Sequence, residues 1–193
     1  MMHPPNGTFI YLLGIAGCGK LTIAKAIHRR HGCIIVDNHH INNVIFSLID
    51  PDGITPLVPE VWEKVSRVRA AVLETVRDLG KPGRTFIFTN ELLEGIPKHN
   101  EVFEDVRRAS AERGARLCAV RLQIDPEEAA RRATCPGRAE AFKEIDPDNA
   151  RRKAREATVL RPQGVETLNL DVTRLTPDEA AERILAHVLA SEA

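Results

Sequence analysis

This chain is organised around the stretch Gly14-Ile15-Ala16-Gly17-Cys18-Gly19-Lys20-Leu21-Thr22. An apolar run, 8–13, precedes it, and apolar positions with helical spacing, 23–27, follow it. A loop of the form G-x-x-x-x-G-K between a strand and a helix is the context in which this motif binds phosphate. The stretch therefore predicts a nucleotide-binding loop made of all nine residues. The alternative, a glycine-rich turn that binds nothing, is disfavoured by the strand and the helix on either side.

The residue types of this loop suit an anion. Gly14, Gly17 and Gly19 can adopt backbone angles closed to residues with a side chain, so that successive N–H groups converge on one point. The helix that follows adds free N–H groups and the positive end of its dipole. Lys20 would reach the β- and γ-phosphates as a point charge.

One position departs from the motif. The residue after the lysine is usually Ser or Thr, whose hydroxyl binds Mg²⁺, but here it is Leu21, which has no oxygen. Thr22 matches the second hydroxyl of the longer G-K-[ST]-T form. Mg²⁺ is expected with the nucleotide, although Leu21 weakens that expectation. Thr22 and Asp37 are the candidate ligands, and the sequence assigns neither.

Length and composition bound the class of protein. A chain of 193 residues fits one domain, 1–193, with a sizeable core. It has 27 basic and 27 acidic residues, so nothing predicts a long polyanion as partner. The sequence contains no run of 18 apolar residues, so no membrane span is predicted. Residues 1–7 lack the apolar core of a signal peptide and predict a loose N-terminus. We expect a cytoplasmic protein, either a monomer or a homodimer.

The cysteines support the same compartment. They are widely spaced and form no C-x-x-C pair, so neither a disulfide framework nor a zinc site is indicated. Free thiols are expected at Cys18, Cys33, Cys118 and Cys135.

Apolar runs and helical patterns alternate along the chain. Strands are predicted at 8–13, 33–36, 85–88, 116–124 and 165–170. Helices are predicted at 41–49, 58–79, 98–113 and 177–190, and Asp-Pro or Thr-Pro caps begin helices after Asp125, Asp146 and Thr176. Strands separated mostly by helices predict an α/β fold with a parallel sheet covered on both faces.

Polar residues follow the second predicted strand. Ligands bind beyond the carboxyl ends of strands in such sheets. Asp37 could position Mg²⁺ through water or take a proton from an attacking hydroxyl, and His39 and His40 could bind substrate or phosphate. The alternative is that Asp37 or Asn38 only caps the helix that follows.

Two further elements offer substrate-binding side chains. The third strand ends in Thr89-Asn90-Glu91. A Walker B strand would place an aspartate there, and Asn90 or Glu91 would substitute only in part. Arg69 interrupts the apolar stripe of helix 58–79 and could reach an anionic or hydroxyl-rich substrate, although a solvated arginine is the commoner case.

A basic segment precedes the fifth strand. Residues 131–161 hold nine basic and five acidic side chains around the loop 134–138. A mobile flap of this kind would exclude water and stabilise charge during transfer, with Arg131 and Arg138 as the candidate catalytic arginines. The alternative, a solvated and ion-paired surface helix, is expected to describe 151–155.

The order of these parts resembles the P-loop kinases of small metabolites and nucleoside monophosphates, the group of shikimate kinase, gluconate kinase and adenylate kinase. The resemblance is carried by the loop 14–22, the strand end at Asp37, the stretch Asp125-Pro126-Glu127-Glu128-x-x-Arg131-Arg132, and Leu170-Asp171-Val172-Thr173. Gly-Lys-Leu-Thr with a later Asn-His-His is similar to bacterial members of that group labelled only as ATPases.

The resemblance implies a three-layer P-loop fold with strand order 2-3-1-4-5, a helical lid at about 126–146 and an acceptor-binding region at about 38–80. ATP would bind at the first loop, with Lys20 and the lid arginines on the transferring phosphoryl group. The adenine would lie near the lid base and the loop after the fifth strand. This implies nucleotide-binding roles for Arg132, Asp171, Thr173 and Arg174.

Three functions compete. The first is a phosphotransferase that moves the γ-phosphate of ATP to a small-molecule or nucleotide acceptor. The second is a nucleotide-binding sensor or partner-binding protein with weak or no transfer, which Leu21 favours. The third, a kinase of nucleic-acid ends, is disfavoured by the neutral charge and by an aromatic content of 4%.

Overall fold

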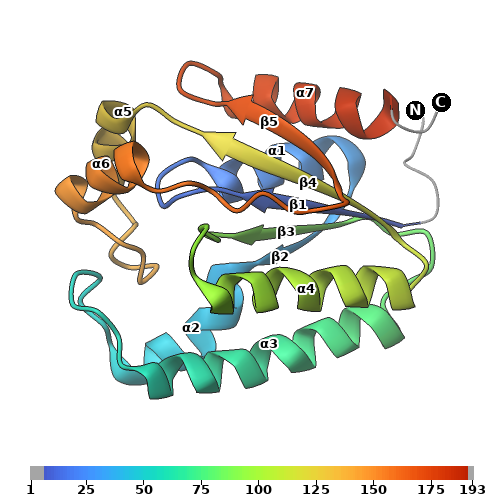
Figure 1. The fold of residues 1–193 in the computed structure, drawn as a ribbon, viewed down its shortest axis with the longest axis horizontal. Coiled ribbons are helices and arrows are strands. Elements are labelled where there is room, and N and C mark those ends of the chain that lie inside the picture. Colours follow the sequence, from blue (N-terminus) through green and yellow to red (C-terminus); the bar gives the residue numbers. More distant parts are fainter. Residues whose placement is uncertain (1–6, 191–193) are drawn as a thin grey trace.

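The computed structural model describes residues 7–190. Five strands form one parallel sheet in the order β2-β3-β1-β4-β5, as predicted (Figure 1). The strands are β1 Thr8–Leu13, β2 Ile34–Asp37, β3 Phe86–Asn90, β4 Arg116–Gln123 and β5 Glu166–Asp171. Of the expected loose terminus 1–7, residues 1–6 lie outside the described part, and Gly7 is buried.

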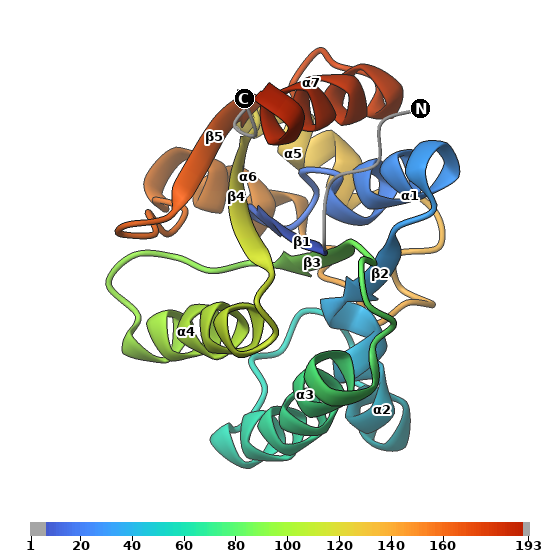
Figure 2. The same ribbon diagram turned by 90° about the vertical axis from the view of Figure 1, so that its right-hand side faces the viewer.

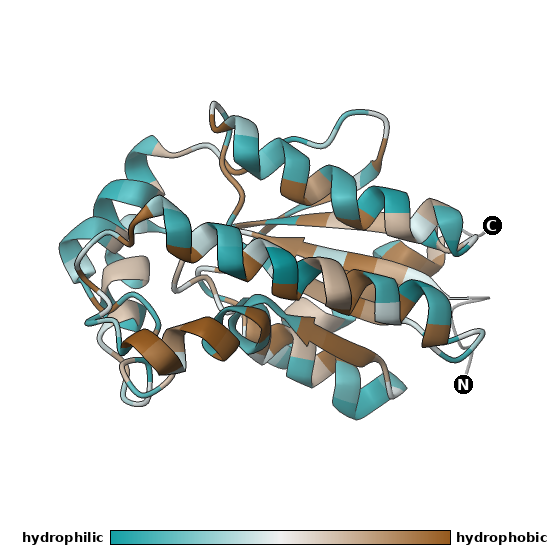
Figure 3. Ribbon diagram, turned by 90° about the horizontal axis from the view of Figure 1, so that it is seen from below, coloured by the Kyte–Doolittle hydropathy of each residue, from teal (hydrophilic) through white to brown (hydrophobic). Residues whose placement is uncertain are grey.

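The central strand explains the sheet. β1 pairs in parallel with β3 on one side and β4 on the other, and every residue from Thr8 to Leu13 is buried. A strand that is apolar without alternation has to be covered on both faces. Figure 3 accordingly shows strands that are largely brown between helices that alternate teal and brown.

Seven helices surround the sheet in the described part of the chain. They are α1 Lys20–His31, α2 Asn38–Ile49, α3 Pro59–Leu79, α4 Pro97–Glu112, α5 Pro126–Ala133, α6 Pro147–Glu156 and α7 Pro177–Ala190. α1 and α7 lie together on one face of the sheet and α3 and α4 on the other (Figures 1 and 2). α5 and α6 pack on each other beyond the carboxyl ends of the strands, next to the loop after β1.

The predicted caps are present. The Asp125 carboxylate accepts hydrogen bonds from the N–H groups of Glu127 and Glu128, and Asp146 caps α6 in the same way. At α7, Thr176 Oγ1 accepts from the Glu179 N–H while the Glu179 carboxylate accepts from the Thr176 N–H. These reciprocal bonds satisfy N–H groups that a helix start leaves free.

α2 begins three residues earlier than predicted. Asp37 ends β2 and is also the N-cap, because its Oδ2 accepts a hydrogen bond from the His39 N–H at 3.2 Å. The polar residues after β2 therefore lie in the first turn of a helix rather than in a loop. A second apolar cluster of Ile41, Phe46 and Val65 joins α2 to α3 and fixes this helix away from the main core.

No helix within residues 7–190 combines the length and apolar composition that crossing a membrane would require.

Candidate active site

The loop after β1 has a backbone that only glycine accommodates. Gly17 and Gly19 have φ angles of 85° and 90°, in the left-handed region that other residues rarely adopt. A Cβ atom on Gly17 would lie 3.2 Å from the Ala129 carbonyl oxygen of α5, and one on Gly14 would lie 2.6 Å from Cys18 Sγ. The loop therefore fits closely between its own turn and the helix that begins the expected lid.

Lys20 lies across this loop. Its Nζ donates to the carbonyl oxygens of Gly14 at 2.7 Å and Ile15 at 2.8 Å. The ammonium group is thus held by two carbonyl oxygens at the start of the loop.

Glu91 already contacts the loop. Its Oε2 accepts a hydrogen bond from the Ala16 N–H at 2.6 Å, and its Oε1 pairs with Lys153 Nζ at 2.8 Å. Burial opposes ionisation of Glu91, but the charges of Lys153 and Lys20 outweigh it, and the pKa of Glu91 is lowered. A carboxylate therefore already accepts a hydrogen bond from one of the loop N–H groups.

Lys153 corrects the expectation for α6. Arg152 and Arg155 are exposed and ion-paired, as expected for 151–155, but Lys153 is largely buried between Glu91 and Glu144 and lines the cleft. Burial opposes its charge, yet these two carboxylates raise its pKa. The sequence signal for this burial is the pair Ala150 and Ala154, which lie three residues before and one residue after Lys153 and mark the inner face of the helix.

Asp37 combines both roles that the sequence allowed. It is 3% exposed and lines the cleft while it caps α2. Its Oδ1 accepts a hydrogen bond from Thr89 Oγ1 at 2.5 Å, and Thr89 Oγ1 in turn accepts from the Asn38 N–H. The ends of β2 and β3 are thereby linked by side chains.

Asn90 extends this network to β1. Its Nδ2 donates to Asn38 Oδ1 at 2.7 Å, and its Oδ1 accepts from the Tyr11 hydroxyl at 2.9 Å. Burial raises the pKa of Tyr11 and keeps it a neutral donor. The Asn90 amide, which lines the cleft, is therefore held in one orientation.

Only one of the two histidines, His39, lines the cleft. His39 lines the cleft, and its Nδ1 is buried with no hydrogen-bond partner among the described residues. Burial lowers the pKa of His39 to about 4, with Asp37 opposing and Lys143, Lys20 and Arg138 adding to the shift. His40 is exposed and does not line the cleft, because consecutive helical side chains point about 100° apart.

Arg69 faces the same cleft from α3. Its Nε is buried and has no hydrogen-bond partner in the part of the chain that the structure describes. Burial lowers its pKa, against the opposing influence of Tyr11 and Asp105. An unpartnered buried guanidinium N–H of this kind can donate to a ligand.

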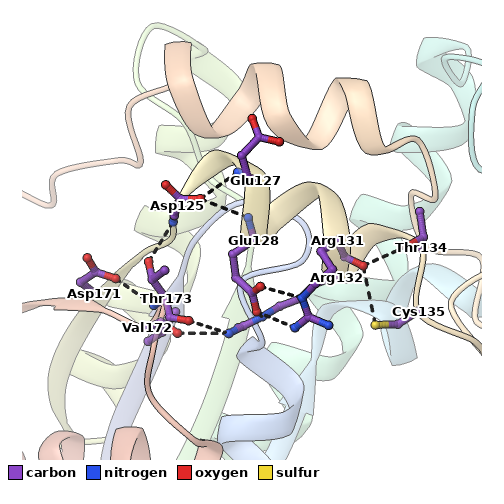
Figure 4. A network of polar contacts seen from close by, with 10 residues as sticks. All are labelled: Asp125, Glu127, Glu128, Arg131, Arg132, Thr134, Cys135, Asp171, Val172 and Thr173. Carbon is purple, nitrogen blue, oxygen red and sulfur yellow. Dashed lines mark hydrogen bonds and ion pairs between the residues drawn. The ribbon is translucent and has the colours of Figure 1, made fainter.

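The two arginines at the lid entry, Arg131 and Arg132, also differ in where they lie (Figure 4). Glu128 holds both, and the hydrogen bonds of Arg131 and then of Arg132 lower its pKa to about 2. Arg132 also donates to the carbonyl oxygens of Val172 and Thr173, and its Nη1 would lie 3.6 Å from a Cβ on Gly19. Arg131 has a side chain 66% exposed and does not line the cleft. Arg132 is therefore the lid-entry arginine beside the loop.

The loop between α5 and α6 brings two cations over the cleft. Arg138 donates from Nε and Nη2 to the Glu144 carbonyl oxygen, and Lys143, which the sequence did not single out, lines the cleft beside it. Phe142, just before Lys143, has a φ angle of 51°, which is unfavourable for an aromatic residue and marks a constrained turn.

The residues expected near the adenine lie on the loop after β5, but three of them do not line the cleft. Asp171 accepts from the Thr173 N–H, and Thr173 Oγ1 accepts from the Asp125 N–H. These bonds tie the loop after β5 to the start of α5. The side chains of Asp171, Thr173 and Arg174 do not line the cleft. Its lining on this loop is made by Val172, Leu175, Thr176 and Pro177.

One continuous cleft joins these groups. Its volume is about 1490 Å³, and its lining includes the loop residues from Ala16 to Thr22 except Cys18, the ends of β2 and β3, the inner face of α3 and the lid. Trp62 lies in the wall of this cleft, 44% exposed and edge-on to Phe46.

The oxygen donors near the loop do not fit the usual Mg²⁺ site. Leu21 lines the cleft where the motif places a hydroxyl, and Mg²⁺ binds oxygen ligands in near-octahedral geometry. Both oxygens of Asp37 and both oxygens of Glu91 already accept hydrogen bonds or pair with Lys153. Thr22 is the one hydroxyl of this loop on the cleft surface.

Solved structures share this fold. A gluconokinase from Sinorhizobium meliloti 1021 is 19% identical over 98% of this chain and 95% of its own, with a TM-score of 0.65. A sugar kinase from Janibacter sp. is 18% identical over 94% of each chain, with a TM-score of 0.63. The APS kinase of Mycobacterium tuberculosis, in complex with AMPPNP and APS, is 17% identical over 96% of this chain and 99% of its own, with a TM-score of 0.58.

A scan against protein-family models and a search of curated protein sequences gave no match. The structural similarities confirm that the chain has the P-loop kinase fold. This is the fold of the group that its sequence resembles.

Proposed function

We propose that this protein is an ATP-dependent phosphotransferase that moves the γ-phosphate of ATP to a small-molecule or nucleotide acceptor. The observation that carries the proposal is the single cleft between the glycine-rich loop and the polar ends of β2 and β3. Its volume of about 1490 Å³ exceeds the roughly 300–1,000 Å³ of a pocket for one ligand. There is room for a nucleotide and an acceptor side by side.

The loop would hold the phosphates. Its N–H groups and the start of α1 favour negative charge, and Lys20 lies on the same loop, bonded to the carbonyl oxygens of Gly14 and Ile15. Phosphoryl transfer is catalysed mainly by positioning and by stabilising charge on the transferring group. Lys20 and Arg138 are the cations proposed for that task, since both line the cleft whereas Arg131 does not.

The opposite end would hold the acceptor. Asp37 is proposed to accept a hydrogen bond, and in transfer a proton, from the attacking hydroxyl. His39 is neutral at pH 7 because its pKa is about 4, so it can bind a hydroxyl without repelling the cations around it. The free N–H of Arg69 suits an acidic or hydroxyl group on the same acceptor.

We propose that two segments of a single domain, 1–193, form the lid and the acceptor-binding region. Residues of about 126–146 include Arg138 and Lys143, which reach over the cleft from the α5–α6 loop. Residues of about 38–80 supply α2 and α3, which pack on each other through Phe46 and Val65.

The test is acceptor-dependent ADP formation, measured with pools of small hydroxylated and phosphorylated compounds. We expect turnover that is lost in Lys20→Met and in Asp37→Asn, while Asp37→Asn still binds ATP in calorimetry. Asp78→Asn, an exposed aspartate on α3, serves as the control and is expected to match wild type. Failure of ATP to bind wild type, or Asp37→Asn turnover equal to wild type, would refute the proposal.

A nucleotide-binding sensor is the second candidate, favoured by Leu21 and by the carboxylate of Glu91 on the Ala16 N–H. It predicts ATP binding with no acceptor-dependent ADP from any pool. It also predicts a nucleotide-dependent change in protease sensitivity of the loop 134–146.

A further inference from the structure

We propose that the glycine-rich loop 14–22 binds ATP as the metal-free anion, with lysine and arginine side chains of this loop and of the lid in place of Mg²⁺. The inference rests on the nucleotide site of the proposed function. It concerns which ionic form of the nucleotide that site accepts.

The first step is the donor set. Leu21 lies in the first turn of α1, directly after Lys20, and lines the cleft. It presents methyl groups where a metal ligand needs an oxygen. Thr22 follows about 100° further around the helix, so its hydroxyl does not replace the missing one at the same point.

The second step is the state of the acidic groups. Glu91 is bound to the Ala16 N–H and to Lys153. Asp37 accepts from the Thr89 hydroxyl and the His39 N–H, and Glu144 is bound to Lys153 and Asn149. A metal ion would have to share each of these carboxylates with a lysine or with the N-cap of α2.

The third step is charge. The residues that line the cleft include eight lysines or arginines and four aspartates or glutamates, an excess of four positive charges. Fully ionised ATP carries about four negative charges, about two on its terminal phosphate and one on each of the other two phosphates. Lys98 and Arg132 already pair with Glu101 and Glu128, which do not line the cleft. The remaining excess of two positive charges equals the charge that Mg²⁺ would bring.

The fourth step is that neither of two lid cations, Arg138 and Lys143, forms an ion pair with an acidic group of the described residues. Arg138 donates only to a backbone carbonyl oxygen, and Lys143 forms no ion pair within residues 7–190. Burial lowers the pKa of Lys143, with Asp37 opposing and Arg138 and Lys20 lowering it further. These cations repel one another, and an anion placed among them relieves that repulsion.

The test is calorimetric titration of ATP and ADP into the full chain, in EDTA and in excess Mg²⁺. We expect ATP to bind in EDTA at least as tightly as in Mg²⁺. A tenfold or greater gain in affinity with Mg²⁺ would overturn the inference and leave the proposed function standing. Absence of binding in both conditions would overturn both.

Variants of Leu21 isolate the hydroxyl. Leu21→Ser supplies an oxygen, and we expect Mg²⁺ then to strengthen ATP binding by about fivefold or more. Leu21→Ala shortens the side chain without adding an oxygen, and its binding is expected to stay indifferent to Mg²⁺. Equal responses of the two variants to Mg²⁺ would contradict the inference.

Variants of the lid isolate the cations. Arg138→Met and Lys143→Met are each expected to weaken ATP binding in EDTA by about tenfold, the loss of one charge-assisted contact. The control is Arg152→Met, an exposed arginine of α6 that does not line the cleft, which should bind ATP as wild type does. Wild-type affinity in EDTA for both Arg138→Met and Lys143→Met would refute the role of the lid.

Discussion

Acid should destabilise this protein through one histidine. The pKa of His39 is about 4 in the folded chain, chiefly because the ring is buried, against about 6.5 when unfolded. Below pH 6.5 the unfolded chain gains a proton at His39 that the folded chain does not accept until about pH 4. The sign is therefore a loss of stability as the pH falls from about 6.5 to 4.

The size of the effect follows from the two pKa values. The linkage relation gives a loss of about 1.4 kcal/mol at pH 5.5 and about 2.5 kcal/mol at pH 4.5. The groups that set the shift lie on several elements: Asp37 at the end of β2, Lys20 on α1, and Lys143 and Arg138 in the lid. The lid therefore contributes to the shift together with burial.

Urea unfolding at pH 7.5 and pH 5.5 measures this loss. Because other groups also titrate, wild type is compared with His39→Gln. We expect the free energy of unfolding to fall by about 1.4 kcal/mol less in His39→Gln than in wild type between the two pH values. His40→Gln, the exposed neighbour, should behave as wild type. The His39 ring proton, assigned in NMR spectra by its absence in His39→Gln, should titrate near pH 4. A midpoint at or above pH 6.5, or parallel losses in wild type and His39→Gln, would refute the reasoning.

Three further predictions use matched pairs of residues. Phe46→Ala, which empties the α2–α3 cluster, should lower the free energy of unfolding by about 3–4 kcal/mol. Val44→Ala on the exposed face of α2 should change it by less than about 0.5 kcal/mol; fluorescence of Trp62 in urea reports both, and equal losses would contradict the packing. Arg132→Met should cost about 1–2 kcal/mol, because it breaks the bonds to the Val172 and Thr173 carbonyl oxygens. Arg131→Met should cost little in the same urea unfolding assay, and a larger loss in Arg131→Met than in Arg132→Met would reverse the assignment. Gly17→Ala and Gly137→Ala both place a side chain at a φ near +80°, but only Gly17→Ala meets a neighbour, so ATP titration should show lost binding in Gly17→Ala alone.

The fold could be predicted because each signal is local. Buried parallel strands are continuous apolar runs, and the Asp-Pro and Thr-Pro caps mark helix starts within a residue or two. The loop 14–22 then fixes where β1 ends and α1 begins. The start of α2 was missed because one residue, Asp37, ends a strand and caps a helix at once.

The site could be predicted only in part because its remaining contacts are tertiary. Glu91 reaches the loop from the position just after β3, and Lys153 reaches Glu91 from α6, across 62 positions of the sequence. Nothing in a run of lysines and arginines distinguishes Lys153 except the alanines beside it. Arg131 and Arg132 are adjacent and identical in type, and only the phase of α5 decides that Arg132 faces the loop.

The net charge of zero hides how the charge is arranged. The cleft holds an excess of four positive charges, so the rest of the chain is correspondingly acidic. Such a field draws anions into the cleft and repels them from the remaining surface. A nucleic-acid strand would need a positive track across open surface, whereas this positive charge lies between the lid and α3. The arrangement therefore favours a small anion that fits inside the cleft, and its binding should weaken as ionic strength rises.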